Sequence, residues 1–288
     1  MYINKEDKFI LNKPRIIEKE EIGNVLLGDL ETCDDDKTLF DFSYRVCSTI
    51  ENKVLCRGSY VLEESWFTKN IINGIYSKNK KKRYKKYLEK GTYKGITREK
   101  LNELINALVR KYDIKVFCAY NGGFDLESLV RTLSKENKRT KLWKSKVLNE
   151  ESLLLRLHLL DIGVLCKCFY ETDDFKNWYD LNIKVRTKSG RRKVNCEIMT
   201  QYLLKDYDFI EEHTGQKDLD VEYQLLMCCL GRRDIKQVAL NWCMNWGISR
   251  LATYPLSQEC KAYRICCAYD KDFIQATYYN KNKLVLCN

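Results

Sequence analysis

Short apolar runs alternate along this chain with longer segments in which apolar residues recur every three or four positions. The apolar runs lie at 24–32, 114–120 and 153–168. Runs of this length that end in polar residues are typical of buried strands. Residues 39–62 contain further strand-like runs separated by turn residues, which predicts a small antiparallel meander after the first strand. The pattern therefore predicts a protein that mixes strands with helices.

Helical spacing marks the segments between these strands. Thr97 can cap a helix over Arg98–Tyr112, and another helix is predicted to begin near Phe124. A shorter helix is expected at about Glu197–Leu204. Four apolar residues then form the buried stripe of a further helix: Leu219, Tyr223, Leu226 and Leu230.

The last part of the chain is predicted to be helical over Asp234–Leu251, because four apolar residues fit one helical face: Ile235, Val238, Trp242 and Trp246. We therefore expect a main domain at 1–230 and a helical C-terminal extension at 231–288. Two interpretations of the extension stay open. Its helices pack as core elements on the main domain, or its tryptophans form a docking surface for a polymerase or another replication protein.

The composition is that of a soluble globular protein, with 44% hydrophobic and 32% charged residues and only 2 prolines among 288 residues. A chain of this length can bury a full core as one large domain or two small ones. Charged residues recur from Met1 to Glu20, so no signal peptide is predicted. No apolar run reaches the ~18 residues that a membrane span needs. We expect a cytoplasmic protein without a membrane partner.

The 14 cysteines are scattered, no Cys-x-x-Cys pair occurs, and only 2 histidines accompany them. This spacing disfavours a structural zinc site. Scattered cysteines are consistent with reduced thiols in the cytoplasm.

The net charge of +11 makes a polyanionic partner plausible. Positive charge concentrates in two stretches, 78–87 and 184–193, the second of which looks like a hairpin around Gly190. Either stretch could simply be a solvated face. The alternative for the first is an arm that follows nucleic-acid phosphates while its tyrosines stack on bases. In that interpretation Lys82, Arg83 and Tyr84 are candidate substrate contacts.

Two carboxylates end the first strand. Asp29 and Glu31 are separated by one residue, so they point to one side while Leu30 points into the core. Neighbouring acids repel each other unless a cation lies between them, and hard divalent cations take oxygen ligands. The simpler interpretation is a strand that runs into an acidic surface loop.

Two later segments carry similar chemistry. Asp125 stands at the start of a helix, directly after a strand that breaks at Asn121-Gly122-Gly123. His213 lies on a loop, and Asp218 lies in the first turn of the helix that follows. Each has an ordinary interpretation, since the helix dipole favours an acid at its N-terminus and a histidine before a helix is commonly a surface residue.

Taken in order, Asp29-x-Glu31, Asn121-x-x-Phe124-Asp125 and His213-x-x-x-x-Asp218 resemble the three motifs of the DEDD exonuclease superfamily. This superfamily comprises proofreading-type nucleases, and the histidine indicates its DEDDh branch. The resemblance covers about residues 20–230. It implies an RNase H-like fold, with a mixed central sheet flanked by helices, and makes the basic segments at about 68–95 and 180–195 insertions. Tyr120 departs from the pattern, since histidine often stands there.

The resemblance implies a metal-dependent 3′-to-5′ exonuclease that degrades single-stranded nucleic acid, with DNA slightly preferred. Four carboxylates would hold two Mg²⁺ or Mn²⁺ ions: Asp29, Glu31, Asp125 and Asp218. Such ions clamp the attacking and leaving oxygens of a phosphodiester. His213 would act as general base, because an imidazole pKa of ~6.5 lies near working pH. The terminal base would lie near Leu30, Thr32, Asn121 and Phe124.

Two alternatives remain. The enzyme could trim RNA or clear short oligonucleotides rather than act on DNA. A protein of a different class could use the fold and its basic arms only to bind nucleic acid or a partner. The presence of all five motif residues disfavours the second alternative, because a binding protein has no need of mutually repelling acids.

Overall fold

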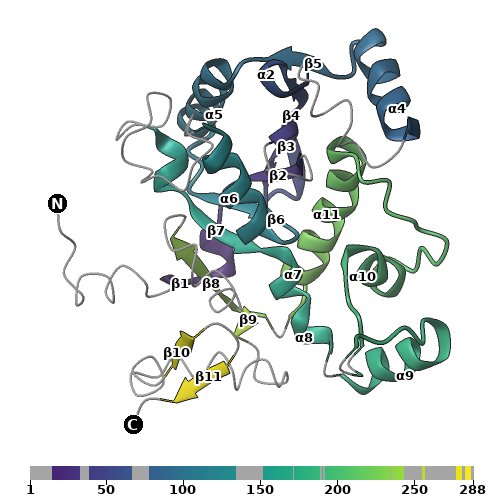
Figure 1. Ribbon diagram of the computed structural model, residues 1–288. Helices are drawn as coiled ribbons and strands as arrows, with labels where there is room; N and C mark the ends of the chain where they lie inside the picture. Colours follow the sequence, from purple (N-terminus) through teal and green to yellow (C-terminus); the bar gives the residue numbers. More distant parts are fainter. Residues whose placement is uncertain are drawn as a thin grey trace.

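The computed structural model describes 15–32, 39–66, 78–133, 152–170, 172–188, 190, 192–233, 235–242 and three short strands after residue 254. Among these residues a central sheet runs through the molecule with helices on both sides (Figure 1). No helix in the described part of the chain is both long enough and apolar enough to cross a membrane.

Five strands make up the middle of the sheet. They are β2 (Asn24–Thr32), β3 (Leu39–Ser48), β4 (Lys53–Leu62), β6 (Val116–Ala119) and β7 (His158–Asp161). Their spatial order is β4-β3-β2-β6-β7. The first three form the expected antiparallel meander, whereas β6 runs parallel to β2 and β7 runs parallel to β6. This mixed sheet has the strand order and directions of the RNase H-like fold, which confirms the predicted fold class.

The sheet continues at both edges. On one side β5 (Lys94–Ile96) pairs with β4, and on the other β8 (Gln237–Trp242) lies between β7 and β1 (Arg15–Glu18). A short β9 (Pro255–Leu256) also pairs with β8. The remaining strands, β10 (Thr277–Asn280) and β11 (Lys283–Leu286), pair with each other.

The predicted helix at 234–251 is therefore wrong over the residues that the structure describes. Val238 and Leu240 are buried at the two-residue spacing of a strand, whereas Val238 and Trp242 had also fitted a helical spacing. Because β8 joins the central sheet, the sheet extends beyond the predicted boundary at residue 230. Trp246 and most of the proposed docking region lie outside the described residues.

The helices have the following bounds: α2 Glu63–Trp66, α4 Lys78–Glu89, α5 Arg98–Tyr112, α6 Gly122–Leu133, α7 Ile162–Leu165, α8 Lys167–Tyr170, α9 Asp173–Asn182, α10 Cys196–Leu203 and α11 Gly215–Leu230, with 3₁₀ turns at Lys19–Glu21 and Leu153–Arg156. The prediction of α5 is confirmed, including the side chain of Thr97, which accepts a hydrogen bond from the Lys100 N–H. The apolar stretch 153–168 is a strand only at β7, because Asp161 caps α7 immediately afterwards.

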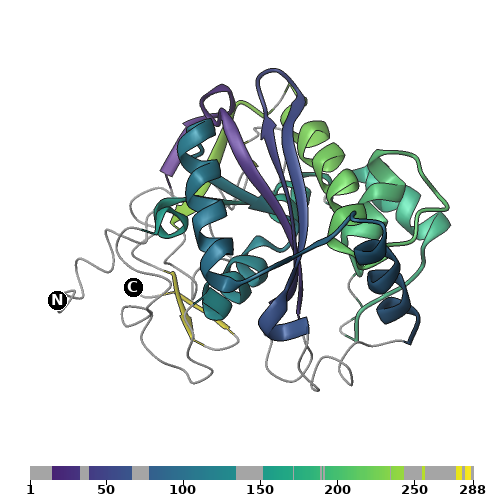
Figure 2. The same cartoon turned by 90° about the horizontal axis from the view of Figure 1, so that it is seen from above.

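The sheet separates two hydrophobic cores. Figure 2 shows the helices that lie on the two sides of the sheet. Helices α5 and α6 cover one face, where Leu101 and Leu129 pack against strand residues such as Leu26. Helices α7 to α11 cover the other face, where Leu225 and Met199 pack near Leu27. This arrangement brings the start of α11 across the sheet close to the ends of β2 and β3.

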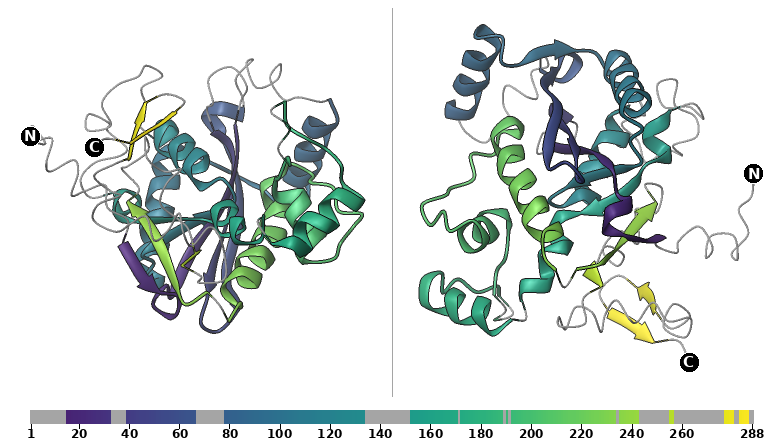
Figure 3. Two further views of the ribbon diagram at one scale, coloured as in Figure 1. Left: turned by 90° about the horizontal axis from the view of Figure 1, so that it is seen from below. Right: turned by 180° about the vertical axis from the view of Figure 1, so that it is seen from behind.

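A third, smaller cluster fixes the basic helix α4 at one end of the sheet. Its buried members are Phe40, Val61, Tyr84 and Tyr93. Helix α4 lies beside the first turn of α11 in Figures 1 and 3. The predicted basic arm is thus a helix that packs through its tyrosines next to the segment carrying His213.

Candidate active site

The end of β2 presents two acids on one side of the strand. Leu30, between them, is 5% exposed and packs into the core beneath α6, as the alternation of a strand predicts. Asp29 and Glu31 are only partly buried. The Leu30 side chain lies in the core, so the predicted substrate contact at this residue stays a prediction for its backbone.

The junction of β6 and α6 supplies the third acid. Asn121 is exposed and has a φ of 133°, which is unusual for a residue other than glycine. The turn that it makes starts α6 and places Asp125, which is 6% exposed, in the first helical turn. The backbone N–H of Leu30 donates to the Asp125 carboxylate, so this acid is held directly against the end of β2.

The first turn of α11 supplies the fourth acid and the histidine. Asp218 is buried and accepts a hydrogen bond from the Thr214 N–H at 2.8 Å, which caps the helix. His213 stands just before this cap with a φ of 53°, and its side chain is 66% exposed. A Cβ on Gly215 would lie 2.8 Å from the Cβ of Ser43 and 3.0 Å from the Asp29 carbonyl oxygen, so only glycine allows this close approach.

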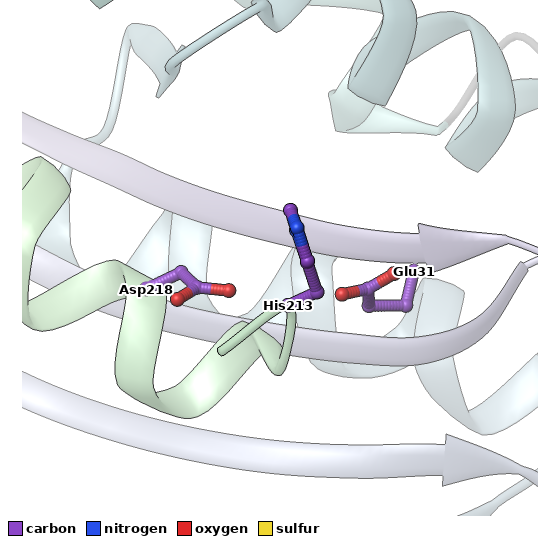
Figure 4. A group of neighbouring side chains, drawn as sticks. All are labelled: Glu31, His213 and Asp218. Atoms are coloured by element: carbon purple, nitrogen blue, oxygen red, sulfur yellow. The ribbon is translucent and has the colours of Figure 1, made fainter. Parts of the chain in front are cut away.

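Glu31, His213 and Asp218 converge. One ligand atom of each lies within 4.8 Å of the other two, so the three can hold a metal ion. Figure 4 shows the carboxylates of Glu31 and Asp218 pointing toward each other, with the imidazole of His213 rising between them. The third motif of the sequence therefore meets the first in space, although more than 180 residues separate Glu31 from His213 along the chain.

Burial and, after it, mutual repulsion raise the pKa of the acids at this site. Burial raises the pKa of Asp29 well above its ordinary value, and the charges of Glu222, Asp125, Glu31 and Asp218 raise it further. Burial also raises the pKa of Asp125, together with Asp161 and Glu31. Among the described residues, no lysine or arginine forms an ion pair with Asp29 or Asp125. The four acids predicted from the sequence thus lie in one environment. Within the described residues, no basic side chain neutralises Asp29 or Asp125 there.

Two acids of this environment were missing from the sequence prediction. Asp161 ends β7, beside Asp125, and burial raises its pKa to about 6. Glu222 lies one turn after Asp218 on α11 and is buried. The sequence offered an indication of each. Asp161 ends a strand, and the carboxyl ends of parallel strands meet at one sheet edge. Glu222 follows Asp218 by four residues, and residues four apart share a helical face.

The donor set fits hard divalent cations. Carboxylate oxygens dominate it and no thiolate belongs to it, a combination that suits Mg²⁺ or Mn²⁺ rather than zinc. Buried carboxylates that raise one another's pKa are costly unless protons or cations neutralise them. The residues present therefore fit the ions that the sequence motifs imply.

A different buried acid anchors the elements around the site. Asp41 on β3 lies opposite Glu31 in the sheet and is fully buried. Its carboxylate accepts hydrogen bonds from the hydroxyls of Tyr84, Tyr93 (3.0 Å) and Ser43 (3.1 Å) and from the Gly215 N–H (3.2 Å). Burial raises the pKa of Asp41 to about 6, although these donors lower it. We call Asp41 and these four donors the Asp41 hub.

The Asp41 hub corrects the prediction for Tyr84. This side chain is 0% exposed and donates to Asp41, so its ring is not available to stack on a base. The hub instead fixes α4 against β3 and the start of α11, where Tyr93 also accepts a hydrogen bond from the Gln216 N–H at 3.1 Å. One buried carboxylate thus connects the basic helix with the helix that carries Asp218.

The charged face of α4 lies beside the histidine loop. Arg83 donates to the carbonyl oxygen of Glu212 at 3.3 Å and to its carboxylate at 3.0 Å. Lys82, Lys85 and Lys86 are exposed. The remaining predicted substrate contacts also stay accessible, since Asn121 is exposed and Thr32 and Phe124 are partly buried.

The second basic segment has a different character. An antiparallel bridge between Arg186 and Arg192 confirms the predicted hairpin, and Gly190 has a φ of 77°. Both arginines form ion pairs with Asp180, and both lie over the ring of Tyr179. Their charge therefore contributes to the local structure of the hairpin.

A cavity of about 280 Å³ lies on the other side of the first turn of α11. Half of its lining residues are basic or aromatic, namely Arg45, Arg57, Lys94, Tyr44 and Tyr60. None of the clustered acids lines it. The acids at the strand ends are therefore separate from this cavity. We call them the acid cluster; its members are Asp29, Glu31, Asp125, Asp161, Asp218 and Glu222.

No known protein-family model matches the sequence, and no curated protein is significantly similar to it. Among solved structures, the chain is similar to a 3′-exonuclease solved with the histone mRNA stem-loop, with 13% identity and a TM-score of 0.42 over 73% of this chain and 64% of that one. It is also similar to E. coli Exonuclease I in complex with a dA16 oligonucleotide, with 12% identity and a TM-score of 0.43 over 73% of this chain and 41% of that one.

A full-length 3′-exonuclease is similar at 12% identity and a TM-score of 0.42, over 73% of this chain and 82% of that one. This chain spans less than two thirds of the length of the first two structures. Since every TM-score lies below 0.5, the fold is assigned from strand order and direction.

Proposed function

We propose that this protein is a divalent-metal-dependent nuclease that removes nucleotides from the 3′ end of single-stranded nucleic acid, with DNA slightly preferred over RNA. One observation carries the proposal. Acids from β2, α6 and α11 converge beside an exposed histidine, in an environment where they raise one another's pKa. Such a cluster is costly to a protein that does not bind cations there.

Asp29, Glu31, Asp125 and Asp218 would hold two Mg²⁺ or Mn²⁺ ions. When bound, ions of this kind neutralise the charge that develops on a phosphodiester and position its attacking and leaving oxygens. The chain's own contribution is to fix the four carboxylates. Leu30 N–H holds Asp125 and Thr214 N–H holds Asp218, so two of the acids are oriented by backbone groups.

His213 would accept the proton of the attacking water. Its side chain is exposed, so its ring can reach solvent and substrate, and its ligand atom lies within 4.8 Å of those of Glu31 and Asp218. Glu211 lies 4.0 Å from Nδ1 and can stabilise the imidazolium that results. The histidine is the basis for proposing the DEDDh branch, because the related branch has tyrosine in this position.

Helix α4 would bind the strand upstream of the reacting 3′ end. Lys82, Lys85 and Lys86 are exposed, and Arg83 contacts the residue next to His213. Cations in such a position attract phosphates without reading the sequence. Asn121, Thr32 and Phe124 would contact the terminal nucleotide at the strand ends, whereas the side chains of Leu30 and Tyr84 are buried.

The proposal is tested with 5′-labelled single- and double-stranded DNA and RNA, incubated with the protein and Mg²⁺ or Mn²⁺. We expect a ladder that shortens from the 3′ end, fastest on single-stranded DNA, and no product with EDTA or with a blocked 3′ end. Faster degradation of RNA would favour the exoribonuclease alternative. Binding of all substrates without any cleavage would favour the nucleic-acid-binding alternative.

A further inference from the structure

We propose that Glu222 supplies a further carboxylate oxygen to the divalent cations, in addition to the four acids of the sequence motifs. The inference rests on the proposed function, because it concerns the same ions. It concerns a residue outside those motifs, placed one helical turn beyond Asp218.

The position of Glu222 is set by α11. Residues four apart lie on the same face of a helix, so Glu222 faces the sheet as Asp218 does. Its side chain is 4% exposed, and the backbone N–H of Tyr120, at the end of β6, hydrogen-bonds to the carboxyl group. Glu222 therefore lies between α11 and the strand ends, behind the acids of the motifs.

One oxygen of this carboxyl group lacks a partner. Oε2 is buried and accepts no hydrogen bond from any residue that the structure describes. Its acidic neighbours are Asp29, Asp125, Asp218 and, more weakly, Glu211. Buried polar atoms normally have a partner, so an unpartnered carboxylate oxygen among acids indicates a cation as its partner.

Asp161 is a weaker candidate for the same role. Its carboxylate accepts hydrogen bonds from the backbone N–H groups of Val164, Gly163 and Gly123, and Lys167 lowers its pKa. These contacts provide hydrogen-bond partners for the Asp161 carboxylate, which caps α7. Glu222 has one backbone donor and no described cation within ion-pair distance.

The test compares wild type with Glu222→Gln, which keeps the size of the side chain and removes its charge. Glu103→Gln, an exposed position on α5, is the matched control. Mn²⁺ binding is measured by calorimetry and melting temperature is measured in EDTA and in Mn²⁺. We expect Glu222→Gln to bind Mn²⁺ at least about tenfold more weakly, with the control unchanged.

The melting temperatures give a second readout. In EDTA, Glu222→Gln should melt above wild type, because one repelling charge has gone, whereas the stabilisation that Mn²⁺ adds should be smaller. Glu222→Asp, which retains a carboxylate, should bind Mn²⁺ with intermediate affinity, and it serves as the test if the glutamine variant does not fold.

Unchanged Mn²⁺ affinity in Glu222→Gln would overturn the inference, as would an equal loss of melting temperature with and without Mn²⁺. If wild type binds Mn²⁺ and cleaves DNA while Glu222→Gln behaves like wild type, only this inference fails. If wild type binds no Mn²⁺ at all, the proposed function fails with it.

Discussion

Two buried acidic regions lie within a few residues of each other and are stabilised differently. In the Asp41 hub, a single carboxylate is surrounded by three hydroxyl groups and a backbone N–H. In the acid cluster, Asp29 is surrounded by other carboxylates, all of which raise its pKa. Asp41 and Glu31 are partners across the same pair of strands, so the contrast is local.

The contrast shows that this fold can supply hydrogen-bond donors to a buried acid. It does so at Asp41, where the donors lower the pKa that burial raises. At Asp29 the charges of four neighbouring acids add to the effect of burial and raise the pKa further. The acid cluster is therefore suited to cations from solution, whereas the Asp41 hub is a structural anchor.

The largest effect is expected from breaking the acid cluster. Asp29→Asn or Asp125→Asn should abolish Mg²⁺-dependent hydrolysis of single-stranded nucleic acid, because each removes a ligand charge, while the fold is retained. Release of labelled nucleotides and circular dichroism measure the two properties. Asp113→Asn is the control, since Asp113 is exposed at the opposite end of β6. Undiminished hydrolysis by either cluster variant would refute the assignment.

The next effect concerns His213. His213→Ala should slow hydrolysis by ~10²–10⁴-fold, the usual contribution of a general base. The ions should still bind, because the four carboxylates remain. Added imidazole should restore part of the rate, a response that a merely structural histidine would not give. A rate within a factor of two of wild type would remove His213 from the mechanism.

The Asp41 hub predicts a pH effect on stability. The pKa of Asp41 is raised to about 6, so the folded state binds this proton more tightly than the unfolded state. Its contribution to stability is therefore complete below about pH 4 and is lost as the pH rises through about 6. Between these limits, the unfolding free energy of wild type should fall relative to Asp41→Asn by about 3 kcal/mol.

Denaturant unfolding of both proteins at a series of pH values in EDTA measures this difference. A difference that stays constant from pH 4 to pH 7 would show that Asp41 does not titrate as the hub requires. Glu103→Gln should follow wild type throughout, because its exposed side chain lies outside both acidic regions.

The smallest effect is expected at the surface of α4. The double substitution Lys82→Glu and Lys86→Glu should weaken binding of a single-stranded oligonucleotide and flatten the slope of log affinity against log salt by about 1.4. Binding is measured without divalent metal to prevent cleavage. Arg110→Glu with Lys111→Glu, exposed on α5, is the control. An unchanged slope would make α4 a solvated helix without a role in binding.

Much of the sheet follows from local patterns. The ends of β2 and β6 are visible in the sequence because an apolar run stops at polar residues, and Thr97 marks the start of α5. β8 was missed because Val238 and Trp242 fit a helical spacing as well as a strand. Pairing with β1, more than 200 residues away, decides between the two.

The acids of the site could be predicted where a motif gave their spacing. Glu222 and Asp161 belong to no such motif, and only the packing of α11 and β7 brings them to the cluster. The Asp41 hub was invisible for the same reason, since Tyr84 and Tyr93 are 43 and 52 residues from Asp41. The basic residues around Tyr84 in the sequence suggested that its side chain is exposed. In the structure Tyr84 and its neighbours Tyr87 and Leu88 instead pack on Phe40 and Val61.

The most direct test of the acid cluster is a calorimetric titration of the metal-free protein with Mn²⁺, performed on wild type and on Asp29→Asn. The proposed function predicts saturable binding of two ions by wild type and loss of at least one of them in the variant. An absence of saturable binding by wild type, or the same stoichiometry and affinity in both proteins, would contradict a cation site at these acids.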